Sequence, residues 1–279
     1  MTCDPFFQLN EYEFRVPGLE RTYTFLHISD VHISAPDYET DPEEKAKLEK
    51  SVSNWESGRI SFAKAFHESC APEHLIPLNG YFDRWVEFAN ELNPDALLCT
   101  GDLFDFYAEA DVRYLRDALS KLKPDFLWVP GNHEVDDRPA FREFMGEDRS
   151  LQIRRYGKLK LLGLNDAAKT VTAAQTARLR EEAEDGCYPI LLAHIPLRTA
   201  ANDRALESIG AYYSIHQGES DSETEAFLAY LTAPECPIRE VFCGHIHGAQ
   251  VTTLAEGKVQ ITASAAMIGG GNLLRFIPA

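Results

Sequence analysis

Short apolar runs alternate with helically spaced apolar positions along the first half of the chain. The runs cover residues 22–29, 96–99 and 125–129. Their β-rich or continuously apolar character predicts strands. Between them, Trp85, Phe88 and Leu92 share one helical face, and the same spacing recurs over residues 112–122. This alternation is typical of βαβ units and predicts parallel strands with helices on the faces of the sheet.

The second half has a different order of elements. Strands are predicted at residues 158–164, 189–193 and 239–243, and helices near 173–184 and 222–232. Residues 250–264 are typical of a hairpin that turns at Glu256-Gly257, and residues 272–277 of a last strand. An α/β (α+β) fold, with two packed mixed sheets flanked by helices, accommodates both halves in a single domain over residues 1–279.

Three segments do not fit this pattern. Residues 35–78 and 197–221 are long, irregular and partly charged. Insertions of this length in a compact domain tend to be lids, binding loops or disordered segments, and these two are candidates to cap an active site. Residues 268–272, Ile-Gly-Gly-Gly-Asn, predict a flexible glycine turn and lack the spacing of a nucleotide-binding loop.

Composition narrows the classes of function. The net charge of −17 argues against a surface that binds a nucleic-acid backbone, although it permits a small phosphorylated substrate. No apolar run approaches the ~20 residues needed to span a bilayer. The N-terminal residues carry acids where a secretory signal would carry lysines, so a cytoplasmic location without membrane attachment is expected. The six scattered cysteines do not indicate a disulfide framework or a thiolate zinc site.

Polar, metal-capable residues follow five of the predicted strands. In order along the chain they are Asp30 and His32, Asp102 and Asp105, Asn132 and His133, His194, and His245 and His247. Each motif alone is compatible with ordinary turn or core chemistry. In an open α/β sheet, however, ligands bind at the carboxyl ends of strands, and five such ends are expected to meet at one edge. The set therefore predicts a functional site.

The ordered set resembles the calcineurin-like metallophosphoesterase family over residues 27 to 248. The matching motifs are Asp30-x-His32, Gly101-Asp102-x-x-Asp105, Gly131-Asn132-His133-Glu134, His194 and Gly244-His245-x-His247. The resemblance implies two packed mixed β-sheets flanked by helices. It also implies a dinuclear centre at which a metal-bridging hydroxide attacks a phosphate ester in line.

The resemblance assigns a role to each motif residue. One metal would be held by Asp30, His32 and His247, the other by Asn132, His194 and His245, with Asp102 as the bridge. Mixed oxygen and nitrogen ligands suit iron, manganese or zinc. His133 would protonate the leaving oxygen or bind the phosphoryl group, and Asp105 would orient it. Glu134 is expected to make a structural hydrogen bond.

Departures from the family pattern bear on the substrate. Asp105 is followed by Phe106, and Glu134 by Val135, where phosphoprotein phosphatases of the superfamily carry arginines in these regions. The chain thus looks more like the bacterial branch that includes cyclic-nucleotide and other phosphodiesterases. A phosphodiester or phosphomonoester of a small molecule is the expected substrate. The alternatives are a catalytically silent scaffold of the same fold or a phosphoprotein phosphatase, and the sequence leaves the oligomeric state open.

The other histidines have simpler interpretations. His27 lies within the first predicted strand, where a buried, hydrogen-bonded role is expected, and His67 and His74 are expected on the surface. In the second insertion, Tyr212, Tyr213 and His216 offer stacking faces and a hydrogen-bond donor. They are candidate substrate-binding residues.

Overall fold

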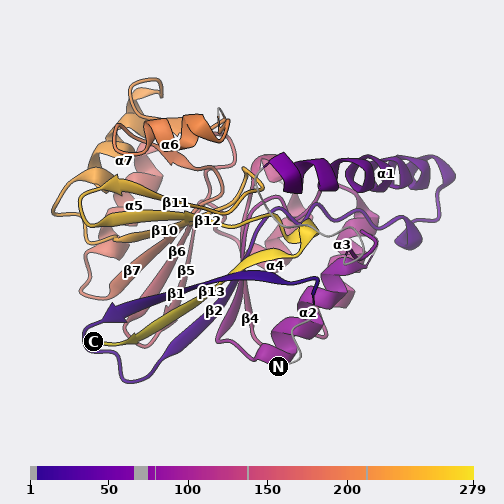
Figure 1. Cartoon of the computed structure of the whole chain (residues 1–279), viewed down its shortest axis with the longest axis horizontal. Coiled ribbons are helices and arrows are strands. Elements are labelled where there is room, and N and C mark those ends of the chain that lie inside the picture. Colours follow the sequence, from indigo (N-terminus) through magenta and orange to yellow (C-terminus); the bar gives the residue numbers. More distant parts are fainter. Residues whose placement is uncertain (1–4, 66–74, 79, 137, 212) are drawn as a thin grey trace.

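Two mixed β-sheets pack face to face with helices on both outer sides (Figure 1). The computed structural model describes residues 5–65, 75–78, 80–136, 138–211 and 213–279. The first sheet contains, in spatial order, β1 (Gln8–Val16), β13 (Gly270–Pro278), β2 (Tyr23–Ile28), β3 (Ala96–Thr100) and β4 (Asp125–Val129). The second contains β11 (Gln250–Ala255), β12 (Lys258–Thr262), β10 (Glu240–Cys243), β7 (Tyr188–Leu192), β6 (Leu159–Leu164) and β5 (Leu151–Tyr156).

The central strands are parallel, as the βαβ pattern predicted. β2, β3 and β4 pair in parallel, as do β6, β7, β10 and β12. The hairpin of β11 and β12 is antiparallel, and Gly257 at its turn has a positive φ of 68°. Parallel neighbours share one direction, so the carboxyl ends of β2, β3 and β4 lie at one edge of the first sheet.

Alternate residues of the strands face different cores. Phe25, Leu98 and Phe242 belong to the buried cluster between the two sheets. Their chain neighbours Leu26 and Cys243 face the outer helices instead. This period-two alternation with apolar residues on both faces explains why the central strands appear in the sequence as continuous apolar runs.

The helices divide between the two outer faces (Figure 1). Their bounds are α1 (Pro42–Ala65), α2 (Tyr81–Leu92), α3 (Glu109–Leu119), α4 (Arg142–Met145), α5 (Ala173–Ala183), α6 (Asp203–Ser208) and α7 (Ser222–Thr232). α2 packs Trp85 into the cluster behind the first sheet, and α5 and α7 pack Leu179 and Phe227 behind the second. No helix in the described part of the chain is long and apolar enough to cross a membrane.

Several sequence predictions need correction. The irregular segment 35–78 contains the 24-residue helix α1, preceded by the short 3-10 helix η1 (Pro36–Tyr38). The segment 197–221 contains α6 and the small parallel pair β8 (Leu197–Arg198) and β9 (Ile215–His216). α1 was not predicted because many of its positions are charged and exposed, so it lacks a clear apolar periodicity.

The glycine-rich segment 268–272 is also not simply a flexible turn. It leaves the 3-10 helix η5 (Ala266–Ile268) through Gly269, whose φ is 82°, and then enters β13. A Cβ on Gly270 would lie 2.4 Å from the Ser264 side chain. Close packing therefore requires glycine at this position.

Two strands at sheet edges were not predicted, β1 and β5. β1 pairs with β13 alone, and β5 pairs with β6 alone, among the strands described. β1 alternates half-buried and exposed residues, including several charged ones. A strand that buries so little surface carries a weak apolar signal, although its register is clear once β13 is in place.

Glu240 gives the fold a pH-dependent element. It is buried in β10, and the hydroxyl of Tyr188 donates a 2.8 Å hydrogen bond to it. Burial raises the pKa of Glu240 from 4.5 to about 7, although the hydrogen bond from Tyr188 opposes the shift. Because the folded state then binds the proton more tightly than the unfolded chain, this group's contribution to stability falls as the pH rises from about 4.5 to about 7.

Glu240→Gln is therefore expected to be more favourable relative to wild type at pH 8 than at pH 5, because glutamine cannot ionise. Urea unfolding midpoints at both pH values measure the difference. Glu181→Gln, an exposed change on α5, is the matched control and should show little pH dependence. The same difference at both pH values for Glu240→Gln would contradict the assignment.

Candidate metal centre

Five strands end where the predicted ligands begin. β2, β3 and β4 lead to Asp30, Asp102 and Asn132, and β7 and β10 of the other sheet lead to His194 and His245. The two sheets meet along this edge, where segments more than 200 residues apart in the chain come into contact. The backbone N–H of His245 donates to the Asp30 carboxylate, for example, at 2.9 and 3.1 Å.

The turns that carry these residues have unusual backbone geometry. Seven non-glycine residues of the described part have positive φ, and five of them are predicted ligands: Asp30, His32, Asp102, His245 and His247, with φ of 48–72°. A left-handed conformation is costly for residues with a Cβ and persists where the surroundings impose it. Here it directs five side chains from three separate turns toward one another.

Glycines allow the turns to approach closely. A Cβ on Gly101 would lie 2.2 Å from Nδ1 of His194, and one on Gly131 would lie 2.2 Å from Oδ1 of Asp102. A Cβ on Gly244 would lie 1.6 Å from Oγ of Ser29. The glycines of the three Gly-containing motifs are thus required by packing within the site.

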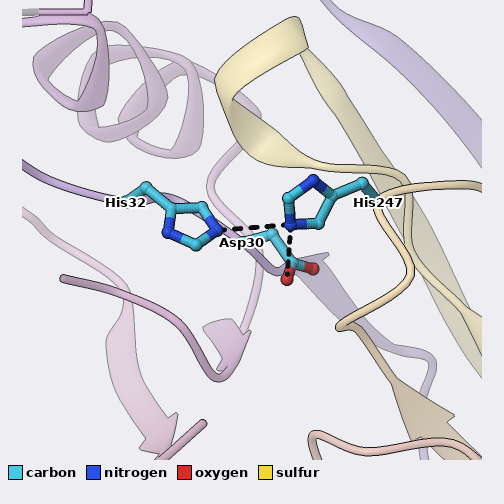
Figure 2. A group of neighbouring side chains, drawn as sticks. All are labelled: Asp30, His32 and His247. Carbon is cyan, nitrogen blue, oxygen red and sulfur yellow. Dashed lines mark hydrogen bonds and ion pairs between the residues drawn. The ribbon is translucent and has the colours of Figure 1, made fainter. Parts of the chain in front are cut away.

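Asp30, His32 and His247 form the first cluster (Figure 2). The Nε2 atoms of His32 and His247 lie 3.3 Å apart, and Nε2 of His247 lies 3.4 Å from Oδ1 of Asp30. All three residues are buried, with Asp30 fully so. Two imidazole nitrogens and a carboxylate oxygen therefore converge on one point.

Asp102, His194 and His245 form the second cluster. Nε2 of His194 lies 3.2 Å from Oδ2 of Asp102, 3.2 Å from Nδ1 of His245 and 3.1 Å from Oδ1 of Asn132. Asp102 also belongs to a third overlapping group with His32 and His133. It therefore lies between the two clusters, as a shared ligand must.

The donor set fits a pair of metal ions. Nδ1 of His194 donates a 2.7 Å hydrogen bond to the carbonyl of Thr100, so Nε2 is the ring nitrogen that faces Asp102 and Asn132. A metal ion that displaces the proton of Nε2 would meet a nitrogen lone pair, a carboxylate oxygen and an amide oxygen at one point. Imidazole, carboxylate and amide oxygen are ligands that manganese, iron and zinc accept in combination.

The buried carboxylates stabilise positive charge at this point. Burial by itself would lower the pKa of His194, but the charges of Asp102 and Asp30 overcome this effect and raise it to about 10. Burial opposes ionisation of Asp102, yet the neighbouring His194 holds the pKa of that carboxyl well below its usual range. The electrostatics of the second cluster thus favour a cation.

A layer of hydrogen bonds fixes the ligands. Asp166 accepts the backbone N–H groups of His194 and Ile195, both at 2.9 Å. Glu134 accepts the backbone N–H groups of Asp102, Phe104 and Gly131 at 2.7–3.1 Å and is fully buried, which confirms its predicted structural role. Burial raises the pKa of Glu134 to about 7.

His133 lies beside the clusters with one face still accessible. It is part of the 3-10 helix η3 (Asn132–Glu134), and its backbone N–H donates 3.0 Å to Oδ1 of Asp102. Its Nδ1 donates to the backbone carbonyl of Asp105, and the Asp105 carboxylate lies 3.6 Å from the same nitrogen. Nε2 lies 4.0 Å from Oδ2 of Asp102 and thus points toward the predicted metal ligands.

Two residues of α1, Ser51 and Trp55, were missed by sequence reasoning. The Ser51 hydroxyl donates to Oδ2 of Asp105, and the ring centroid of Trp55 lies 4.3 Å from that of His32. Burial opposes ionisation of Asp105, but the neighbouring His32, the hydrogen bond from Ser51 and the nearby Trp55 lower its pKa to about 2. No local motif marks these residues, since α1 reaches the site only through the tertiary fold.

The candidate substrate residues fall in different places. The exposed ring of Tyr213 lies 4.9 Å from the His245 ring, with the Lys169 amine 4.8 Å from its centroid. His216 lies in β9, near Asp203 and Glu219, and lines a cavity of about 410 Å³ that includes none of the predicted ligands. Tyr212 lies outside the described residues. As predicted, His27 is buried and hydrogen-bonded, to Thr100 and Asn272.

Comparison with known proteins agrees with this geometry. The family model "Calcineurin-like phosphoesterase" matches residues 23–249. A dimetal phosphatase from Danio rerio has a similar structure, with a TM-score of 0.52 and 13% identity over 89% of each chain. A 5'-nucleotidase from Candida albicans gives a TM-score of 0.40 and 14% identity over 90% of this chain and 47% of that one. The comparison with curated proteins gives no match.

The family match covers most of the chain and includes every predicted ligand, from Asp30 to His247. The two-sheet architecture is the one that the dimetal phosphatase shares. This chain belongs to the calcineurin-like phosphoesterase family.

Proposed function

We propose that this protein is a dinuclear-metal phosphoesterase that hydrolyses a phosphodiester or phosphomonoester of a small molecule. The observation that carries the proposal is the convergence of two His/Asp clusters that share Asp102. Family membership supports a phosphate ester as the substrate class. The absence of the arginines of phosphoprotein phosphatases after Asp105 and Glu134 favours the bacterial phosphodiesterase-like branch.

The chain's own residues would hold both ions. Asp30, His32 and His247 would bind one, and Asn132, His194 and His245 the other, with Asp102 between them. Bound manganese, iron or zinc ions would neutralise the phosphoryl oxygens and activate water for in-line attack.

His133 is placed to deliver a proton to the leaving oxygen. The carbonyl of Asp105 accepts from its Nδ1, so ring orientation is fixed and Nε2 faces the centre. The Asp105 carboxylate beside Nδ1 stabilises the protonated imidazolium. Together these contacts keep the His133 imidazole in one orientation while Nε2 carries the proton.

A metal-reconstituted activity screen tests the proposed function. The metal-free protein would be loaded with Mn²⁺, Fe²⁺ or Zn²⁺ and assayed with nitrophenyl phosphate, bis-nitrophenyl phosphate and cyclic nucleotides. Hydrolysis that is lost in His247→Asn and retained in Asp117→Asn, an exposed change on α3, is the expected result. A wild-type protein inactive with every metal and ester would favour the catalytically silent scaffold.

Tyr213→Ala tests whether the second insertion, residues 197–221, contacts the substrate. The exposed ring beside His245 could stack on a planar group of the substrate, so its loss is expected to raise KM severalfold for a substrate with such a group. Metal content and hydrolysis of a small generic ester should change little. Steady-state kinetics on both substrates measure the contrast, and equal KM changes for both would contradict a stacking role.

A further inference from the structure

We propose that α1 is part of the catalytic site: Ser51 and Trp55 are positioning residues that hold the Asp105 carboxylate in place and, through it, His133. This inference rests on the proposed phosphoesterase function and extends it to a helix within the 35–78 insertion. It predicts that the insertion contributes to the rate at which His133 transfers a proton to the leaving oxygen.

Ser51 connects α1 directly to Asp105, and a second buried hydroxyl, that of Ser34, contacts Ser51. The Ser51 hydroxyl donates to Oδ2 of Asp105, and Oγ of Ser34 lies 2.7 Å from Oγ of Ser51. Ser34 and Ser51 are both buried, with 5% and 6% of their surface exposed. Each hydroxyl can donate one hydrogen bond and accept another, so Ser34 can donate to Ser51 while Ser51 donates to Asp105.

Trp55 adds a second contact from the next turn of α1. Residues four apart lie on one helical face, so Ser51 and Trp55 reach the site together. The Trp55 ring is tilted by 31° against His32 at a centroid distance of 4.3 Å, and its centroid lies 5.7 Å from that of His247. Trp55 also helps to lower the pKa of the Asp105 carboxyl, and its indole N–H is the donor that it can offer to that group.

Asp105 is thereby held on one side and faces two histidines on the other. Its Oδ1 lies 3.6 Å from Nδ1 of His133 and 3.8 Å from Nδ1 of His32. Without the Ser51 donor on Oδ2, the carboxylate could rotate away from His133. The contacts from α1 fix the oxygen that stabilises the His133 imidazolium.

The helix itself is anchored close to these contacts. Arg59, one turn beyond Trp55, is 3% exposed and donates to the carbonyls of Ile76 at 2.7 Å and Met267 at 3.3 Å. It also pairs with Glu56 at 2.7 Å. The buried guanidinium links α1 to η5 by its hydrogen bond to Met267. The linkage fixes the position of the helix from which Ser51 contacts Asp105.

The first test compares Ser51→Ala with Ser57→Ala, an exposed serine six residues along the same helix. Ser51→Ala is expected to lower kcat about tenfold, with KM nearly unchanged, because a hydrogen bond to a charged group is lost. The loss should be larger for alkyl esters than for nitrophenyl esters. Ser51→Thr should restore most of the rate, since it keeps the hydroxyl, whereas Ser57→Ala should match wild type. An equal loss in Ser57→Ala, or no loss in Ser51→Ala while wild type is active, would overturn the proposal.

A double-mutant cycle distinguishes positioning from general stability. If Ser51 acts through His133, Ser51→Ala should have almost no further effect on kcat in a His133→Asn background. A loss of the same factor in both backgrounds would show that Ser51 acts elsewhere. Elemental analysis should find the same metal content in Ser51→Ala as in wild type, and a fall would assign its role to the ligand His32.

Tryptophan fluorescence provides a readout that does not depend on turnover. Mn²⁺ quenches nearby indoles at short range, so adding it to the metal-free protein is expected to lower the emission. Trp55→Phe should remove the larger part of this change, while the core residues Trp85 and Trp128 keep their own emission. Quenching that is unaltered in Trp55→Phe would show that α1 does not lie on the metal centre. Wild-type inactivity with every metal would instead count against the proposed function itself.

Discussion

Asp102→Ala is expected to lose most of the bound metal of the purified protein and, with it, its phosphoesterase activity. Asp102 groups with His194 and His245 on one side and with His32 and His133 on the other. Its removal therefore takes a ligand from both proposed ions. Elemental analysis of wild-type protein should find about two transition-metal ions per chain, with manganese, iron and zinc as the candidates.

Asp117→Ala is the control for this change, because it removes an exposed carboxylate from α3 and should leave the metal content intact. Circular dichroism should verify that Asp102→Ala still folds, since Asp102 also accepts the backbone N–H of His133. Asp102→Asn, which keeps that acceptor, provides a second variant. Undiminished metal in a folded Asp102→Ala protein would contradict the shared-ligand role.

His133→Asn is expected to lower turnover by about 10²–10⁴-fold while both metals remain bound. The reason is geometric: Nε2 of His133 points toward the centre, but its backbone and Nδ1 are held by Asp102 and Asp105 rather than by a metal position. The rate loss should shrink for nitrophenyl esters, whose leaving groups need little protonation.

Leaving-group dependence decides between two roles for His133. A proton donor gives a steep dependence of the rate loss on the pKa of the leaving alcohol, whereas a residue that only binds the phosphoryl group slows all esters alike. Uniform losses across a series of aryl and alkyl esters would thus rule out proton donation. Loss of metal in His133→Asn would instead make it a ligand.

Much of the candidate site follows from local sequence. Strand periodicity locates the ends of β2, β3, β4, β7 and β10, and the residues directly after each end are the metal-capable ones. Parallel strands of one sheet end at a common edge, which groups the residues after β2, β3 and β4 on the first sheet and those after β7 and β10 on the second. The packing of the two sheets then joins the two groups. The two-sheet core was predicted because it accommodates both halves of the chain and because the family resemblance implies it.

The amphipathic elements were also predicted from local sequence. α2 presents Trp85 to one core on a repeating face, and the hairpin of β11 and β12 turns at its glycine. Where an element buries one face against the core, its apolar residues recur at regular spacing, and this spacing can be recognised in the sequence.

The remaining elements depended on partners distant in sequence. β1 becomes a strand beside β13, more than 250 residues away, and carries a charged, half-buried pattern of its own. α1 has few apolar positions and is placed by contacts such as those of Arg59 with Met267. His216, close to Tyr213 in sequence, lies in β9 and lines a cavity that includes none of the predicted ligands, because the β8–β9 pair directs the chain away from them.

The sequence by itself determined which residues could hold metal and that each of them follows the end of a strand. Only the tertiary structure decided that Asp102 lies between the two clusters, that Glu134 and Asp166 support them, and that α1 contributes Ser51 and Trp55. The physical reason lies in the range of the interactions. Strand periodicity and turn chemistry are encoded within about ten residues, whereas ligand orientation is set by hydrogen bonds and packing between segments that meet only after folding.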